Sequence, residues 1–191
     1  DYGTWDLGTP TSGPGGAYSG ESCVGTILDN DYGNHVRSRL ISPPVTVPAE
    51  GDPRLRFWHW YSFYINDDDY GQVQIRIAGT TEWETLETYV NHGGNIWTQA
   101  YVPLSDYAGQ SVEIAFFMHA DSGYTEPGWY IDDISIESGP RVLTSPEDWE
   151  SGFDDWVVDN GTWDIGMPAN GPGSAYSGEN CVATRLDRAY N

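Results

Sequence analysis

The sequence predicts an all-β protein, a jelly-roll β-sandwich present as one nearly complete repeat followed by the start of a second. Short stretches of alternating apolar and polar residues, bounded by Gly and Pro, run through the chain. No stretch of ten or more residues has the period of a helix. Many short strands with Gly/Pro turns are typical of a sandwich, and the long connections between them favour a jelly roll.

One stretch occurs twice. Residues 3–8 read Gly-Thr-Trp-Asp-Leu-Gly and residues 161–166 read Gly-Thr-Trp-Asp-Ile-Gly, an offset of 161 − 3 = 158, and 21 of the 33 overlapping positions are identical. Such a period indicates a tandem array. We therefore predict three parts: a jelly-roll repeat lacking its first strand (1–138), a short linker (139–147) and the N-terminal part of the next repeat (148–191).

The strands are expected in the following order. Two short strands near Trp5 and Cys23 flank a long loop rich in Gly and Pro, and residues 40–47 form a strand interrupted by two prolines. Residues 55–65 alternate strictly, and residues 72–77 are the expected hairpin partner. Further strands are expected over 83–89, 97–104, 112–119 and 128–136. The predicted core comprises Trp5, Leu55, Phe57, Ile75, Ile114, Phe116, Trp129 and Ile131.

The face opposite this core is a candidate interaction surface. It carries Arg56, Trp58, Trp60 and Tyr64. An exposed aromatic strip of this kind stacks on sugars. Three alternatives stay open: a loop such as 90–98 covers the strip, a neighbouring subunit covers it, or the strand register is inverted.

The charge of the chain excludes two classes of partner. The formal net charge is −21, the sequence pI is about 4.1, and all eight cationic residues are Arg. Such a surface repels nucleic acids and anionic membranes, and no apolar run approaches the ~20 residues of a membrane helix. The excess of acid fits calcium binding, adaptation to high salt, or a solvated face.

A pair of acids in the last apolar strand is the strongest metal candidate. We expect at least one of Asp132 and Asp133 to point inward, where a buried carboxylate needs an ion or N–H donors as partners. Structural Ca²⁺ is the expected partner, and hydrogen bonds to N–H groups are the alternative. The turn 67–69 is a weaker calcium candidate, since three acids in a hairpin are usually solvated. Cys23 and Cys181 occupy equivalent positions and are expected to be buried thiols rather than disulfides.

The sequence contains no catalytic motif that we can identify. A His-Glu-x-x-His zinc helix, a Gly-x-Ser-x-Gly elbow and a Gly-rich phosphate loop are all absent, and the four His residues are widely spaced. We therefore expect no enzymatic activity.

Residues 128–134 resemble the last strand of MAM domains and of related bacterial jelly rolls, among them the choice-of-anchor J and cleaved-adhesin domains. Residues 40–43, 55–60 and 107–110 resemble other strands and turns of this group, and Trp149-Glu150 is similar to its opening pair. The resemblance implies an extracellular, non-catalytic β-sandwich with structural calcium. By this resemblance the opening Glu and an Asp of the terminal pair are the ligands. Glu150 then serves the second repeat, and Asp132 or Asp133 the first. With one Cys per repeat, the bacterial relatives are the better match.

Two functions remain as hypotheses. The first is a structural or adhesive repeat of a cell-surface or filament-forming protein, with neighbouring repeats or copies of itself as head-to-tail partners. The second is a carbohydrate-binding module appended to a secreted enzyme, with polysaccharide as its ligand. Segment 142–158 is expected to start a second sandwich in a serial array; its insertion into a neighbouring chain or its folding back into the first repeat are alternatives.

Overall fold

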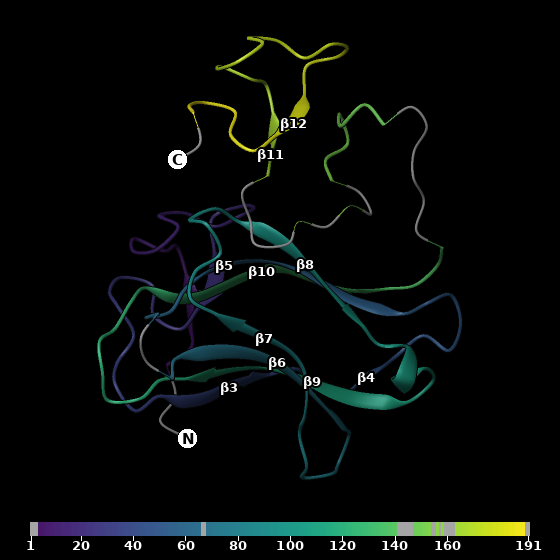
Figure 1. Ribbon diagram of the computed structural model, residues 1–191. Helices are drawn as coiled ribbons and strands as arrows, with labels where there is room; N and C mark the ends of the chain where they lie inside the picture. Colours follow the sequence, from purple (N-terminus) through teal and green to yellow (C-terminus); the bar gives the residue numbers. More distant parts are fainter. Residues whose placement is uncertain are drawn as a thin grey trace.

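The computed structural model describes residues 4–65, 68–140, 147–153, 156, 158 and 163–189. Two antiparallel sheets lie face to face over residues 4–140, and the only helical element in the described chain is a 3-10 turn at Ser105–Tyr107 (Figure 1). Within the described ranges, no helix could span a membrane. The predicted all-β sandwich is confirmed.

The chain crosses repeatedly between the two sheets, as in a jelly roll. The first sheet has the order β1 (Asp6–Gly8), β2 (Cys23–Gly25), β10 (Gly128–Glu137), β5 (Arg54–Ser62) and β8 (Thr98–Pro103). The second has the order β3 (Arg37–Ile41), β9 (Ser111–His119), β6 (Tyr70–Ile77) and β7 (Glu84–Val90), and β4 (Val45–Thr46) also pairs with β9.

The predicted hairpin of residues 55–65 and 72–77 is wrong. β5 pairs with β8 and β10, whereas β6 pairs with β7 and β9 in the other sheet. The connection crosses between the sheets and is anchored by Asp69, which is 3% exposed. Its carboxylate accepts hydrogen bonds from the Tyr32 hydroxyl, at 2.5 Å, and from the Asp121 N–H, at 2.9 Å. Asp69 is therefore a buried, hydrogen-bonded anchor; Asp68 is exposed, and Asp67 lies outside the described residues.

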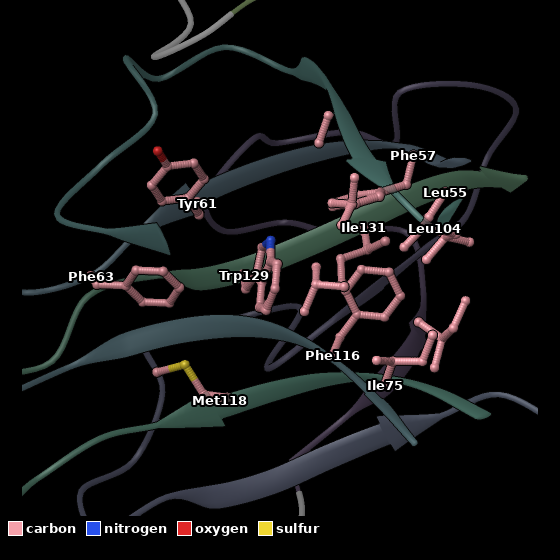
Figure 2. Packing of buried hydrophobic residues seen from close by; sticks show 14 of the residues in the cluster. Leu55, Phe57, Tyr61, Phe63, Ile75, Leu104, Phe116, Met118, Trp129 and Ile131 are labelled. Carbon is pink, nitrogen blue, oxygen red and sulfur yellow. The ribbon is translucent and has the colours of Figure 1, made fainter. Parts of the chain in front are cut away.

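The core lies between the two sheets and centres on Trp129, which is fully buried (Figure 2). Phe116 and Phe63 both pack edge-on against its ring, with centroids 5.5 and 6.3 Å away. The predicted core is confirmed. Seven of its eight members are buried, and the eighth, Trp5, is half-buried and packs against Trp129.

The repeated stretch folds into the same hairpin in both copies. β11 (Asp164–Gly166) pairs with β12 (Cys181–Ala183) in the register of β1 and β2, shifted by 158 residues. Cys23 is buried and Cys181 is half-buried, and both are free thiols. Burial beside Asp132 raises the pKa of Cys23 to about 11, which keeps this thiol unreactive at neutral pH. The division of the chain into three parts stays a prediction.

Candidate functional site

The predicted aromatic strip is not open in this structure. Trp58 and Trp60 are 9% and 5% exposed, because the loop between β1 and β2 folds over them. Tyr18 of this loop stacks on Trp58 with ring centroids 3.7 Å apart, and Trp97 donates its indole N–H to the Gly16 carbonyl at 3.2 Å. The expected cover by a loop is therefore present. Segment 90–98 contributes Trp97 to this cover, and the β1–β2 loop contributes Tyr18.

A segment from beyond the first sandwich also reaches this face. The Phe153 ring lies 6.0 Å from that of Trp58 and is 7% exposed. Trp149 packs 6.4 Å from Phe153 and 5.3 Å from Trp156, so the three rings form one aromatic cluster. This cluster lies on the outer face of the first sheet, and its rings are not members of the Phe57–Ile114 core.

Arg56 shares a side of β5 with the two tryptophans but is held in an ion pair, and Tyr64 lies beyond the strand. The Arg56 Nε lies 3.1 Å from Glu137 Oε2 in an ion pair that Arg54 also joins, and both arginines are buried. Tyr64 lies beyond the end of β5 at Ser62, where its ring contacts Tyr124 with centroids 4.9 Å apart. The alternation of strand residues that grouped Tyr64 with Trp60 ends two residues before it.

Asp132 and Asp133 lie on the outer face of the first sheet, and the prediction that one of them points into the core is wrong. Asp132 is half-buried and Asp133 is exposed. The pairing of β10 with β5 shifts between Asp132 and Ser135, and Asp133 has a φ of 45°, so this bulge brings both carboxylates to one side. Asp132 Oδ2 accepts from the N–H groups of Tyr18 and Ser19 at 3.0 and 3.2 Å. Asp133 Oδ1 accepts from the Ser19 hydroxyl at 2.9 Å.

Glu150 makes the corresponding contact in the second copy. Its Oε1 accepts from the N–H groups of Glu179 and Asn180 at 2.7 and 2.9 Å, and a Cβ on Gly178 would overlap this oxygen. Glu179 and Asn180 are equivalent to residues 21 and 22 by the offset of 158. The terminal Asp pair and the opening Glu thus contact neighbouring positions of the same loop, just before its second strand, and each contact is seen in a different copy.

The described side chains do not themselves complete a metal centre. Among the described residues, no group of three or more His, Cys, Asp or Glu side chains is arranged to hold a metal ion. Asp132 instead accepts from two backbone N–H groups, the alternative partners that the sequence analysis considered. A copy that carried both the opening Glu and the terminal Asp pair would have three carboxylates around this loop, which suits the oxygen ligands that Ca²⁺ prefers. Calcium at this loop stays a prediction.

A cleft of about 470 Å³ opens between the edge strands β7 and β8. His59 lines its floor and is fully buried, and this burial lowers the pKa of His59 to about 3. Gln99, on β8, is 8% exposed, and its Oε1 accepts no hydrogen bond from the residues that the structure describes. No sequence pattern predicts this cleft, because its walls come from two strands that belong to different sheets.

Comparison with known proteins identifies the family. Residues 23–140 match the model of the MAM domain, meprin/A5/mu. The chain belongs to the MAM domain family. The resemblance seen in residues 128–134 and in the earlier strands is therefore confirmed.

Two bacterial proteases contain similar sequence. The chain is 36% identical over 133 residues to Bacillopeptidase F of Bacillus subtilis, an alignment that covers 69% of this chain and 9% of that protein. It is 33% identical over 134 residues to the pre-pro-metalloprotease PrtV of Vibrio cholerae, covering 65% of this chain and 14% of the protease. The chain thus spans only a small part of each relative.

A solved structure shares the fold. The K2 cleaved adhesin domain of Lys-gingipain superposes with a TM-score of 0.51 at 19% identity, over 73% of this chain and 84% of that domain. This similarity supports the jelly-roll architecture.

Proposed function

We propose that this chain is a non-catalytic, extracellular structural or adhesive repeat within a larger protein, stiffened by contacts between consecutive copies. One observation carries the proposal: Phe153, at the start of the second copy, packs on Trp58 of the first sandwich. A surface with this role needs buried aromatic contacts between repeats rather than an open ligand platform.

The relatives support an accessory role. The chain aligns with 9% of one protease and 14% of another, so most of each protein lies outside the alignment. PrtV is a pre-pro-metalloprotease, which fits a secreted context. We expect the chain to hydrolyse neither casein nor chromogenic glycosides.

Calcium belongs to the same proposal. Asp132, Asp133 and the opening Glu, seen here as Glu150, are the residues that would hold the ion. Each binds the loop between the first two strands of a copy, so an ion bound there would fix the loop that covers Trp58. Calcium supplies charge neutralisation among these carboxylates and no chemistry of its own.

Small-angle X-ray scattering on the whole chain tests the stiff connection. We expect a narrow distance distribution for the native chain and a broader, longer one for Phe153→Ala, because the substitution removes the ring that packs on Trp58. Met167→Ala is the matched control, since Met167 is an exposed apolar residue of the second copy. Identical scattering from the native chain and Phe153→Ala would contradict a stiff array.

A further inference from the structure

The outer face of the second sheet carries an ordered set of cationic, aromatic and amide side chains. Arg39 of β3 lies over the Phe117 ring, with its guanidinium carbon 4.4 Å from the centroid. Arg76 of β6 lies over the Trp83 ring at 4.4 Å, and Arg39 approaches the same ring at 5.5 Å. Two guanidinium groups are thus held against the sheet by aromatic rings.

Hydrogen bonds fix these groups in place. Arg39 Nε donates to Gln74 Oε1 at 2.8 Å, and Gln74 Nε2 donates to Gln72 Oε1 at 2.8 Å. Gln72 continues the ladder to the hydroxyls of Thr85 and Thr88 on β7. The result is a polar row across β3, β6 and β7 whose geometry is set before any ligand arrives.

The face is locally cationic although the chain as a whole carries −21. Three of the eight arginines lie on it: Arg37 and Arg39, which alternate along β3, and Arg76. Glu113 pairs with Arg76 at 2.8 Å. Burial lowers the pKa of Arg39, and the positive charges of Arg37 and Arg76 lower it further, so the arginines repel one another here. A bound anion relieves that repulsion.

The face is also accessible. Arg37, Thr85 and Thr88 are exposed, and Arg39, Arg76 and Trp83 are half-buried. Figure 1 shows the hairpin of β11 and β12 on the side of the first sheet, so the outer face of the second sheet (β3, β9, β6 and β7) points away from it.

We propose that this face binds an anionic polysaccharide, with the guanidinium groups of Arg37 and Arg39 on carboxylates or sulfates of the glycan and Gln72, Thr85 and Thr88 on its hydroxyls. Arginine forks match carboxylate and sulfate oxygens in pairs. The large exposed apolar side chains on this sheet lie at strand ends, namely Ile41 of β3, Ile77 of β6 and Val90 of β7. They do not form the apolar centre that a protein partner requires. The amides and hydroxyls between the arginines suit a sugar chain better. This site is independent of the proposed stiff array, because the Phe153 contact lies on the other sheet.

Titration calorimetry of the whole chain at low salt tests the site, with polygalacturonate, chondroitin sulfate and neutral dextran as probes. Binding to one or both anionic glycans is expected, with none to dextran and a steep loss of affinity as NaCl is raised. The two anionic probes distinguish a carboxylate from a sulfate ligand. Arg39→Lys should weaken binding about tenfold, because lysine keeps the charge but loses the fork and the stacking on Phe117.

Arg37→Gln and Arg188→Gln form a matched pair that removes one exposed positive charge each, inside and outside the face. Arg37→Gln should weaken binding, whereas Arg188→Gln should not, and both should melt like the native chain. Equal losses from the two variants would overturn the site. So would a failure to bind either anionic glycan, or binding of poly-glutamate as tight as that of the glycans, which would show that charge alone is recognised.

Discussion

The indole N–H of Trp129 donates to His59 Nδ1 at 3.3 Å in the middle of the core. This hydrogen bond satisfies the buried indole N–H, and it requires the Nδ1 atom of His59 to carry no proton. The Phe57 and Tyr89 rings pack edge-on against the imidazole with centroids 5.3 and 4.6 Å away, so a positive charge here has little solvation. A titratable group is therefore built into the centre of the apolar packing.

Acid should destabilise the fold through His59. Its pKa falls from 6.5 to about 3 on folding, so the unfolded state binds more protons between these values and stability is lost as the pH falls from about 6.5. The slope from this one residue approaches about 1.4 kcal/mol per pH unit. Urea denaturation of the native chain and of His59→Gln at pH 7, 6, 5 and 4 measures it. The glutamine carbonyl can still accept from Trp129, so only the titration is removed; parallel pH curves for the two proteins would contradict this role.

Tyr18 should contribute to stability where its equivalent in the second copy does not. Tyr18 stacks on Trp58, whereas Tyr176, in the same sequence context, is fully exposed. Tyr18→Ala should lower the free energy of unfolding by roughly 0.5–1.5 kcal/mol, the usual worth of an aromatic pair. Tyr176→Ala should change it by less than about 0.5 kcal/mol. Chemical denaturation followed by Trp fluorescence compares them, and equal effects would mean that the stacked loop does not stabilise the sheet.

Phe57→Ala tests the strand register on which the core depends. Phe57 is fully buried and packs edge-on against Phe116 with centroids 5.0 Å apart. Emptying such a site should cost roughly 3–5 kcal/mol. Leu7→Ala, at an exposed position of β1, is the control and should cost less than about 0.5 kcal/mol. A loss under about 1 kcal/mol for Phe57→Ala would mean that the Trp58 side of β5 faces the core.

The strands and the core were predictable because they depend on local alternation. Phe57 and Ile75 could be assigned to the interior since every second residue of β5 and β6 faces it. Alternation does not encode the partner of a strand, however, so the placement of β5 and β6 in different sheets could not be foreseen.

The site depended on contacts between distant residues. Trp58 is covered by Tyr18, 40 residues earlier, and by Phe153, 95 residues later. The repeated Ala-Tyr-Ser-Gly-Glu indicated a loop common to both copies. The motif does not show which aromatic ring the loop covers. The bulge at Asp133 likewise follows from the pairing of β10 with β5 rather than from the two aspartates themselves.

Calcium should raise the melting temperature through Asp132. The structure offers this carboxylate two N–H donors, so hydrogen bonding and calcium binding must be separated. Asp132→Asn does so, because the amide oxygen can still accept from Tyr18 and Ser19 while the charge that attracts the ion is lost.

Calcium at a concentration 100 times its dissociation constant stabilises the native state by about 2.7 kcal/mol. The native chain should therefore melt several degrees lower in excess EDTA, and Asp132→Asn should melt at one temperature with or without EDTA. Asp29→Asn, at an exposed acid of another loop, should keep the native response. If EDTA leaves the native transition unchanged, the loop is held by the hydrogen bonds of Asp132 alone and the calcium proposal fails.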